Sequence, residues 1–324
     1  MLADALKPYK GIVMWRAFVY SPSDADRAKQ AYLEFEPLDG QFRNNVIVQV
    51  KNGPIDFQPR EPYSPLFSAM QHTPLMAEFQ VTQEYLGHSN HLAYLAPMWK
   101  EFFEFVTPAS LKAVAGVANI GTDTNWCGHT FAQANWYAFG RLSWQPSLSS
   151  EHIADEWLKQ TFDSQPSDIN AQLKKMMLDS HEAVVNYMMP LGLHHIFAWG
   201  HHYGPEPWCN IPGARPDWLP SYYHRADKQG IGFDRSSKGS NAVAQYPENL
   251  SKQYDKHQHL SRRISPMVPP CALELPHRKA VALYGTSSAI TTTMESDKSE
   301  TFRRYGMPPK NTLTQNVSMK YSPL

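Results

Sequence analysis

The chain has 324 residues, of which 42% are hydrophobic and 19% charged, enough apolar side chains for a sizeable core and two domains. The 30 Lys and Arg residues balance the 30 Asp and Glu residues, so the formal net charge is zero and nothing favours nucleic acid or an anionic membrane as a partner. No apolar run approaches the roughly 18 residues of a membrane span, which excludes a membrane protein of that kind.

The cysteines and the start of the chain bear on the compartment. Cys127, Cys209 and Cys271 are far apart and odd in number, so the sequence predicts neither a disulfide framework nor a CxxC zinc site. The first residues lack the basic region and long apolar core of a signal peptide. Both features favour a cytoplasmic or periplasmic location over secretion.

Four segments of the first 120 residues have the composition of buried strands, and they begin near residues 12, 46, 76 and 113. Segments with apolar residues at helical spacing lie between or after them, at 24–35, 91–105 and 131–144. The spacing matches the βα period of a (β/α)8 barrel of ~250 residues. We therefore predict for residues 1–145 an α/β fold, a partial (β/α)8 TIM barrel of about four βα units.

The composition changes near Gln145, which predicts a domain boundary. Two long amphipathic helices are expected at 151–162 and 168–189 with no strand between them, so residues 146–255 are predicted to form a mainly α-helical domain. Residues 256–324 are polar, rich in Pro, Ser and Thr, and nearly free of aromatic residues. We expect little packed structure in this tail.

Charged side chains stand where the predicted strands end. Asp56 follows a strand that Asn-Gly-Pro stops, and Glu84 stands at the end of the next strand. If these strands are parallel neighbours, both carboxylates lie on one rim of the sheet, where barrel enzymes carry their catalytic groups. The pair then suits acid/base chemistry, and the alternative for each carboxylate is that it caps the following turn or pairs with a lysine. Glu78, inside the second of these strands, is interpreted as a buried and partnered residue or as a group that supports the site residues from behind.

Two cations fall near the same strand ends. Arg16 and Lys51 either compensate the charge of the carboxylates or bind an anionic group of a substrate, and the residues alone leave both interpretations open.

The aromatic and histidine residues add a sugar-binding hypothesis. Trp126 and Trp208 stand among glycines and prolines, which suits stacking on a sugar as well as core packing. The adjacent histidine pairs at 194–195 and 201–202 lack the spacing of known metal motifs. Since the sequence also has no phosphate-binding loop of the Walker type, we predict no metal and no cofactor.

Six long motifs carry a resemblance that extends from Met1 to about Asp255. They are KNGPIDFQPREP (51–62), TPLMAEFQVTQEYLG (73–87), HLAYLAPMWKE (91–101), VANIGTDTNW (117–126), FAQANWYAFGRL (131–142) and GLHHIFAWGHHYGP (192–205). Together they resemble the α-glucuronidases of glycoside hydrolase family 67. Members remove α-1,2-linked glucuronic acid, or its 4-O-methyl ether, from xylo-oligosaccharides with inversion and without a metal. Their fold is an N-terminal β domain, a central (β/α)8 barrel and a mainly helical C-terminal domain.

The resemblance assigns roles to particular residues. The two base-side carboxylates of the family fall on Asp56 and Glu84, and Arg16 and Lys51 match groups that hold the glucuronate. We add Trp126 as a further substrate-binding candidate. The family's general acid is a glutamate on an earlier barrel strand, which would precede Met1. Residues 1–145 are therefore expected to be the C-terminal half of the catalytic barrel, in a truncated and catalytically impaired chain.

Two classes of function follow from this resemblance. The first is hydrolysis of glucuronic-acid-substituted xylo-oligosaccharides in xylan breakdown. The alternative is a non-catalytic module that binds acidic xylan or another partner. A half barrel leaves edge strands unpaired, so we also expect self-association, a homodimer included. The tail after Asp255 departs from the family pattern, by a frameshift or by divergence.

Overall fold

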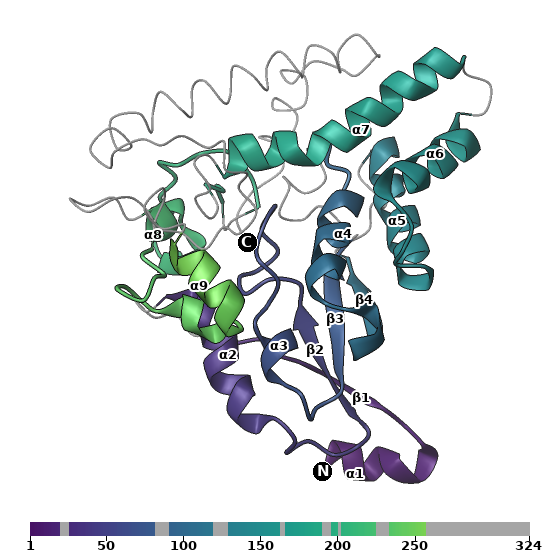
Figure 1. Ribbon diagram of the computed structural model, residues 1–324. Coiled ribbons are helices and arrows are strands. Elements are labelled where there is room, and N and C mark those ends of the chain that lie inside the picture. The colour runs from purple at the N-terminus through teal and green to yellow at the C-terminus, as the bar shows by residue number, and fades with distance from the viewer. Residues whose placement is uncertain are drawn as a thin grey trace, which may run out of the picture.

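The computed structural model describes residues 1–19, 26–81, 91–118, 129–162, 166–189, 196–199, 202–224 and 233–256 (Figure 1). Its centre is a sheet of four strands, β1 (Val13–Arg16), β2 (Val46–Lys51), β3 (Leu75–Gln80) and β4 (Leu111–Val117). Their order is β1-β2-β3-β4, and every neighbouring pair is parallel. The predicted α/β class and the four parallel strands are therefore confirmed, and each strand begins within two residues of its predicted start.

Helices connect the strands, as parallel pairing requires. The short helix η2 (Arg27–Lys29), α2 (Gln30–Phe35) and η3 (Glu36–Leu38) lie between β1 and β2. Helix α3 (Leu66–Ala69) lies between β2 and β3, and α4 (Ala96–Phe105) between β3 and β4. The remaining elements of this first part are short, namely α1 (Leu2–Leu6), η1 (Lys7–Tyr9) and η4 (Pro108–Ser110).

The two faces of the sheet differ in polarity, because successive residues of a strand point to opposite sides. Val50 and Phe79 belong to the apolar face, which is buried in two clusters of apolar side chains. Phe79 packs on α4, with its ring centre 5.7 Å from that of Trp99. The opposite face carries Glu78 and Gln49, which bond to one another. The sheet thus presents a polar face and an apolar face covered by helices.

A second group of helices follows β4. They are η5 (Thr130–Ala132), α5 (Gln133–Trp144), α6 (Ser150–Thr161), α7 (Ser167–Met188), η7 (Pro216–Trp218), α8 (Pro220–His224), η8 (Ala242–Gln245) and α9 (Glu248–Lys256). One apolar cluster joins β3 and α4 to this group, with Leu142, Ile153, Met177 and Tyr254 among its buried members. The expected helices at 131–144, 151–162 and 168–189 are therefore present. The division of the chain at residue 145 stays a prediction, and the tail from residue 257 lies outside the described residues.

Helix α4 starts later than predicted. We expected a helix from His91 to Phe105, but it begins at Ala96 with a proline in its first turn. The residues before it use their backbone amides elsewhere, since Tyr94 N donates to Ser180 Oγ (2.8 Å) and Leu95 N to Asn135 Oδ1 (2.8 Å). These distant side chains satisfy the donors that a helix would have used.

Within the described ranges, no helix is both long and apolar enough to cross a bilayer.

The outer strands generate a testable prediction. In the part of the chain that the structure describes, β1 and β4 each pair with one neighbour only, and Met14 on β1 is 63% exposed. Unpaired edges promote association of strands, and a charge on an edge opposes it. We expect the chain to self-associate in light scattering and Met14→Lys to reduce the apparent mass. The control is Leu33→Lys on α2, 61% exposed but away from the edge, which should change nothing. A monomeric wild-type chain contradicts this expectation.

Candidate active site

Three of the predicted site residues lie at the carboxyl end of the sheet. Arg16 is the last residue of β1, Lys51 is the last residue of β2, and Asp56 lies in the loop that follows β2. Because neighbouring strands are parallel, their carboxyl ends meet on one rim. The shared rim is confirmed for these three residues. Glu84 and Trp126 lie outside the described residues, and their positions stay predictions.

Glu78 is the centre of a hydrogen-bonded cluster behind this rim. Its side chain on β3 is fully buried, and Arg16 binds it with two bonds, Nε to Oε2 at 2.8 Å and Nη2 to Oε1 at 2.5 Å. Gln49 Nε2 on β2 also donates to Oε2. The interpretation of Glu78 as a buried, partnered residue is confirmed. The side chain of Arg16 stays 51% exposed, so Glu78 fixes a guanidinium that solvent can still reach.

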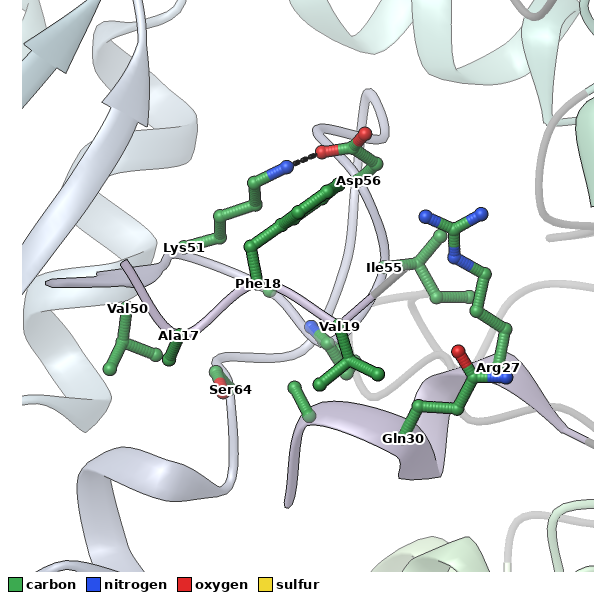
Figure 2. A pocket seen from close by; sticks show the side chains of 13 residues that line it. Ala17, Phe18, Val19, Arg27, Gln30, Val50, Lys51, Ile55, Asp56 and Ser64 are labelled. Carbon is green, nitrogen blue, oxygen red and sulfur yellow. Dashed lines mark ion pairs between the residues drawn. The ribbon is translucent and has the colours of Figure 1, made fainter. Parts of the chain in front are cut away.

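Lys51 is a largely buried cation paired with Asp56 (Figure 2). Its Nζ lies 4.2 Å from the ring centre of Phe18 and 4.5 Å from that of Phe57, within the range of cation–π attraction. Burial lowers the pKa of Lys51 to about 7, an effect that the attraction of Glu78 opposes. Charge compensation is thus present at both cations, since each of them binds a carboxylate.

Glu61 holds the loop that carries Asp56, a role that the sequence did not reveal. Its carboxylate accepts hydrogen bonds from Ile55 N (2.7 Å) and Gln58 N (3.2 Å), on either side of Asp56. A Cβ at Gly53 would lie 2.2 Å from Glu61 Oε2, so only glycine leaves room for this carboxylate. Burial raises the pKa of Glu61 to about 8, because the charged form loses its solvation. A glutamate shortly after an Asn-Gly-Pro turn was the available signal.

A pocket opens beside the Lys51–Asp56 pair, and Figure 2 shows both side chains at its edge with Arg27 across from them. Arg27 of η2 was not predicted as a site residue. Its guanidinium is buried and binds Asp217, which also holds Arg215 at 2.8 Å and 3.0 Å. The charge of Arg27 contributes to lowering the pKa of Lys51. The pocket is lined by Ala17, Phe18, Val19, Arg27, Gln30, Ala31, Val50, Lys51, Gly53, Pro54, Ile55, Asp56 and Ser64.

The metal and sugar-stacking candidates of the sequence lie only partly within the described residues. Among the described residues, no three His, Cys, Asp or Glu side chains gather as metal ligands would. His194, His195 and His201 lie outside those residues. Trp208 is 75% exposed on the surface, so sugar stacking by this residue stays a prediction.

This geometry defines what the rim can do. A carboxylate beside fixed cations can accept a proton from a bound water, and the cations can bind an anionic group of the same substrate. Parallel α/β enzymes place their active sites at this end of the sheet. The fold and the rim are therefore typical of an α/β enzyme domain that handles a negatively charged substrate.

Comparison with known families makes this assignment specific. Residues 1–126 match the model of the glycosyl hydrolase family 67 middle domain, and residues 127–264 match that of the family 67 C-terminus. The chain belongs to glycoside hydrolase family 67, so the resemblance inferred from the six motifs is confirmed.

Relatives with curated names are fungal proteins. Alpha-glucuronidase A of Emericella nidulans is 41% identical over 284 residues, and alpha-glucuronidase A of Aspergillus tubingensis is 38% identical over 281. A probable alpha-glucuronidase A of Aspergillus niger is 39% identical over 281 residues. Each alignment covers 79% of this chain and 33% of the relative, so the chain spans about a third of the length of these proteins.

The cluster around Glu78 can be tested by stability. Glu78→Gln removes the negative charge of a buried carboxylate to which both Arg16 and Gln49 donate hydrogen bonds. Because Arg16 loses its charged partner, we expect the free energy of unfolding to fall by about 2–3 kcal/mol. The matched control is Glu156→Gln, because Glu156 also forms a two-bond pair with an arginine, Arg141, at a more exposed site. That change should cost under about 1 kcal/mol. If urea denaturation gives equal losses in the free energy of unfolding for the two variants, burial does not make the Glu78 pair more stabilising than the exposed pair.

Proposed function

We propose that this chain carries the base side and the glucuronate-binding cations of an α-glucuronidase acting in xylan breakdown. The reaction is hydrolysis, with inversion, of α-1,2-linked glucuronic acid or its 4-O-methyl ether from xylo-oligosaccharides. The observation that carries the proposal is the rim on which Arg16, Lys51 and Asp56 meet. Family membership and the names of the relatives support it.

The proposal extends to the fold. The four-stranded sheet would be the C-terminal half of a (β/α)8 barrel, whose remaining four strands would continue the sheet beyond its two outer strands. The polar face with Glu78 would then line the barrel interior, as the alternation of side chains requires. Residues 146–255 would form the mainly helical C-terminal domain.

In the proposed mechanism, Asp56 with Glu84 removes a proton from the attacking water. Arg16 and Lys51 hold the carboxylate of the glucuronic acid, and Trp126 contacts a sugar ring. An inverting glycosidase also needs a general acid roughly 6.5–9.5 Å from the base. The resemblance matches that acid to none of the 324 residues, so the proposal assigns the proton for the leaving xylose oxygen to none of them.

The first test is the pH dependence of glucuronic acid binding, measured by calorimetry. A carboxylate is bound by charged Lys51, whose pKa is about 7 in the folded chain. Lys51 is protonated below that pH and loses its charge above it, so affinity should fall by up to about tenfold per pH unit above 7. Lys51→Arg keeps the charge and should remove the slope. Glucose, which has no carboxylate, should show no slope with the wild type. The same slope in Lys51→Arg would assign the titration to another group.

The second test is turnover by the chain alone on aldouronic oligosaccharides. Each general acid or base step contributes about 10²–10⁴-fold, and this chain is proposed to supply only the base. We therefore expect no measurable release of glucuronic acid, together with binding of the oligosaccharide. Binding without turnover also fits the alternative of a non-catalytic acidic-xylan-binding module. Turnover that Asp56→Ala abolishes would show that the chain contains its own general acid.

A further inference from the structure

We propose that helix α7 positions the Asp56 loop through His181 and Glu182, which makes these two side chains positioning residues of the site. The importance of this positioning for catalysis rests on the function proposed above for Asp56. The position of the loop itself can be tested without that function. Figure 1 shows α7 near the end of the sheet toward which the arrow of β2 points.

Both side chains contact the loop a few residues after Asp56. His181 is 2% exposed, and its Nε2 lies 2.6 Å from the carbonyl oxygen of Pro59. The next residue of the helix, Glu182, binds Arg60 with two bonds, at 3.2 Å from Nη1 and 2.7 Å from Nη2. Two neighbouring residues of α7 thus hold two neighbouring residues of the loop.

The hydrogen bond from His181 fixes a protonation state. A carbonyl oxygen only accepts, so Nε2 must carry the hydrogen and donate it. Burial lowers the pKa of His181 to about 4, and the charge of Arg60 adds to this effect. His181 therefore stays neutral near pH 7 and keeps its donor. His181 thus serves as a permanent hydrogen-bond donor to the loop.

Helix α7 is a firm support for such contacts. Met177 and Val184, on either side of His181, are buried in the main apolar cluster. The same helix also holds the segment after β3, because Ser180 Oγ accepts a bond from Tyr94 N (2.8 Å) and Tyr187 OH lies 2.5 Å from His91 Nδ1. The Asp56 loop and the segment that precedes α4 are therefore both held by helix α7.

The hydrogen bonds that Glu61 accepts have a different role. They join residues of the same loop, Ile55 and Gln58, and so fix its local shape. Only contacts to another element can fix where that loop stands relative to the strands. Glu61 supplies the first constraint. Helix α7 shares the second with the Lys51–Asp56 pair, with the packing of Ile55 on α8, and with Glu101 of α4, whose Oε1 lies 3.7 Å from Arg60 Nη2.

Hydrogen exchange of the full chain tests the positioning directly. The amides of Ile55 and Gln58 exchange when their bonds to Glu61 open, and we expect those bonds to open more often when the loop loses a support from another element. The amides of α6 serve as the reference for global unfolding. His181→Phe removes the donor and keeps a ring, and we expect roughly tenfold faster exchange of the loop amides with α6 unchanged. His181→Gln, which keeps a side-chain N–H, should restore slow exchange. Glu182→Gln should show a smaller increase.

A matched control lies on the same helix. Asp179→Asn removes the charge of an exposed i,i+4 pair with Lys175, away from the loop, and should leave the loop amides unchanged. Parallel acceleration of loop and α6 amides in His181→Phe would show a merely structural role and overturn the proposal. If that variant fails to fold, Glu182→Gln decides, because this side chain is 45% exposed and its change leaves the core intact. Unchanged loop exchange in that variant then overturns the proposal.

Glucuronic acid binding separates the two proposals. If Lys51 and Asp56 form the glucuronate site, His181→Phe should weaken binding about tenfold, and His181→Gln should restore it, with the melting temperature measured alongside. A wild-type chain that binds no glucuronic acid would reject the proposed function. The exchange data would still decide whether α7 holds the loop.

Discussion

The buried carboxylate of Glu78 is the constraint on which the rim depends. An ionised carboxylate inside a sheet is strongly unfavourable unless charged and polar partners surround it. Arg16 and Gln49, from the two preceding strands, provide those partners, so one residue ties three strands together at their carboxyl ends. The register of the parallel pairs brings them to one face. The position of Arg16 at the rim is thus a consequence of satisfying Glu78.

Elements remote in the sequence hold the rest of the rim. Ile55, next to Asp56, packs in a small cluster with Tyr222 and Tyr223 of α8. Arg235 binds Asp26 at 2.8–3.0 Å beside η2, which carries Arg27 of the pocket. Helix α8 and the segment that carries Arg235 therefore contact the segments that line the pocket.

The sequence predicted what local patterns determine. The four strands follow from runs of β-branched and aromatic residues between turn signals, and the shared rim of Arg16, Lys51 and Asp56 follows from where those runs stop. The late start of α4 and the roles of Arg27 and His181 depend on partners that are distant in the sequence, which a local pattern does not identify. Tyr94 N, for example, donates to a serine 86 residues away. Such residues need coordinates. Glu61 is different, because its partners Ile55 and Gln58 are near in the sequence. The roles of Glu84 and Trp126 stay predictions, Glu84 from its place at a strand end and from the family resemblance, and Trp126 from its place among glycines and prolines.

The charges of the rim also constrain how it can bind an anion. Arg16 is bound to Glu78 and Lys51 to Asp56, so each cation already has a carboxylate partner. An incoming carboxylate therefore has to share a cation with a carboxylate already present. Lys51 suits this sharing, because burial has lowered its pKa to about 7 and an added negative charge would raise it again. If the proposed function holds, arrival of an anionic sugar would favour the protonated lysine. Asp56, as the proposed base, would then keep a cationic partner while its carboxylate takes up the proton of a water.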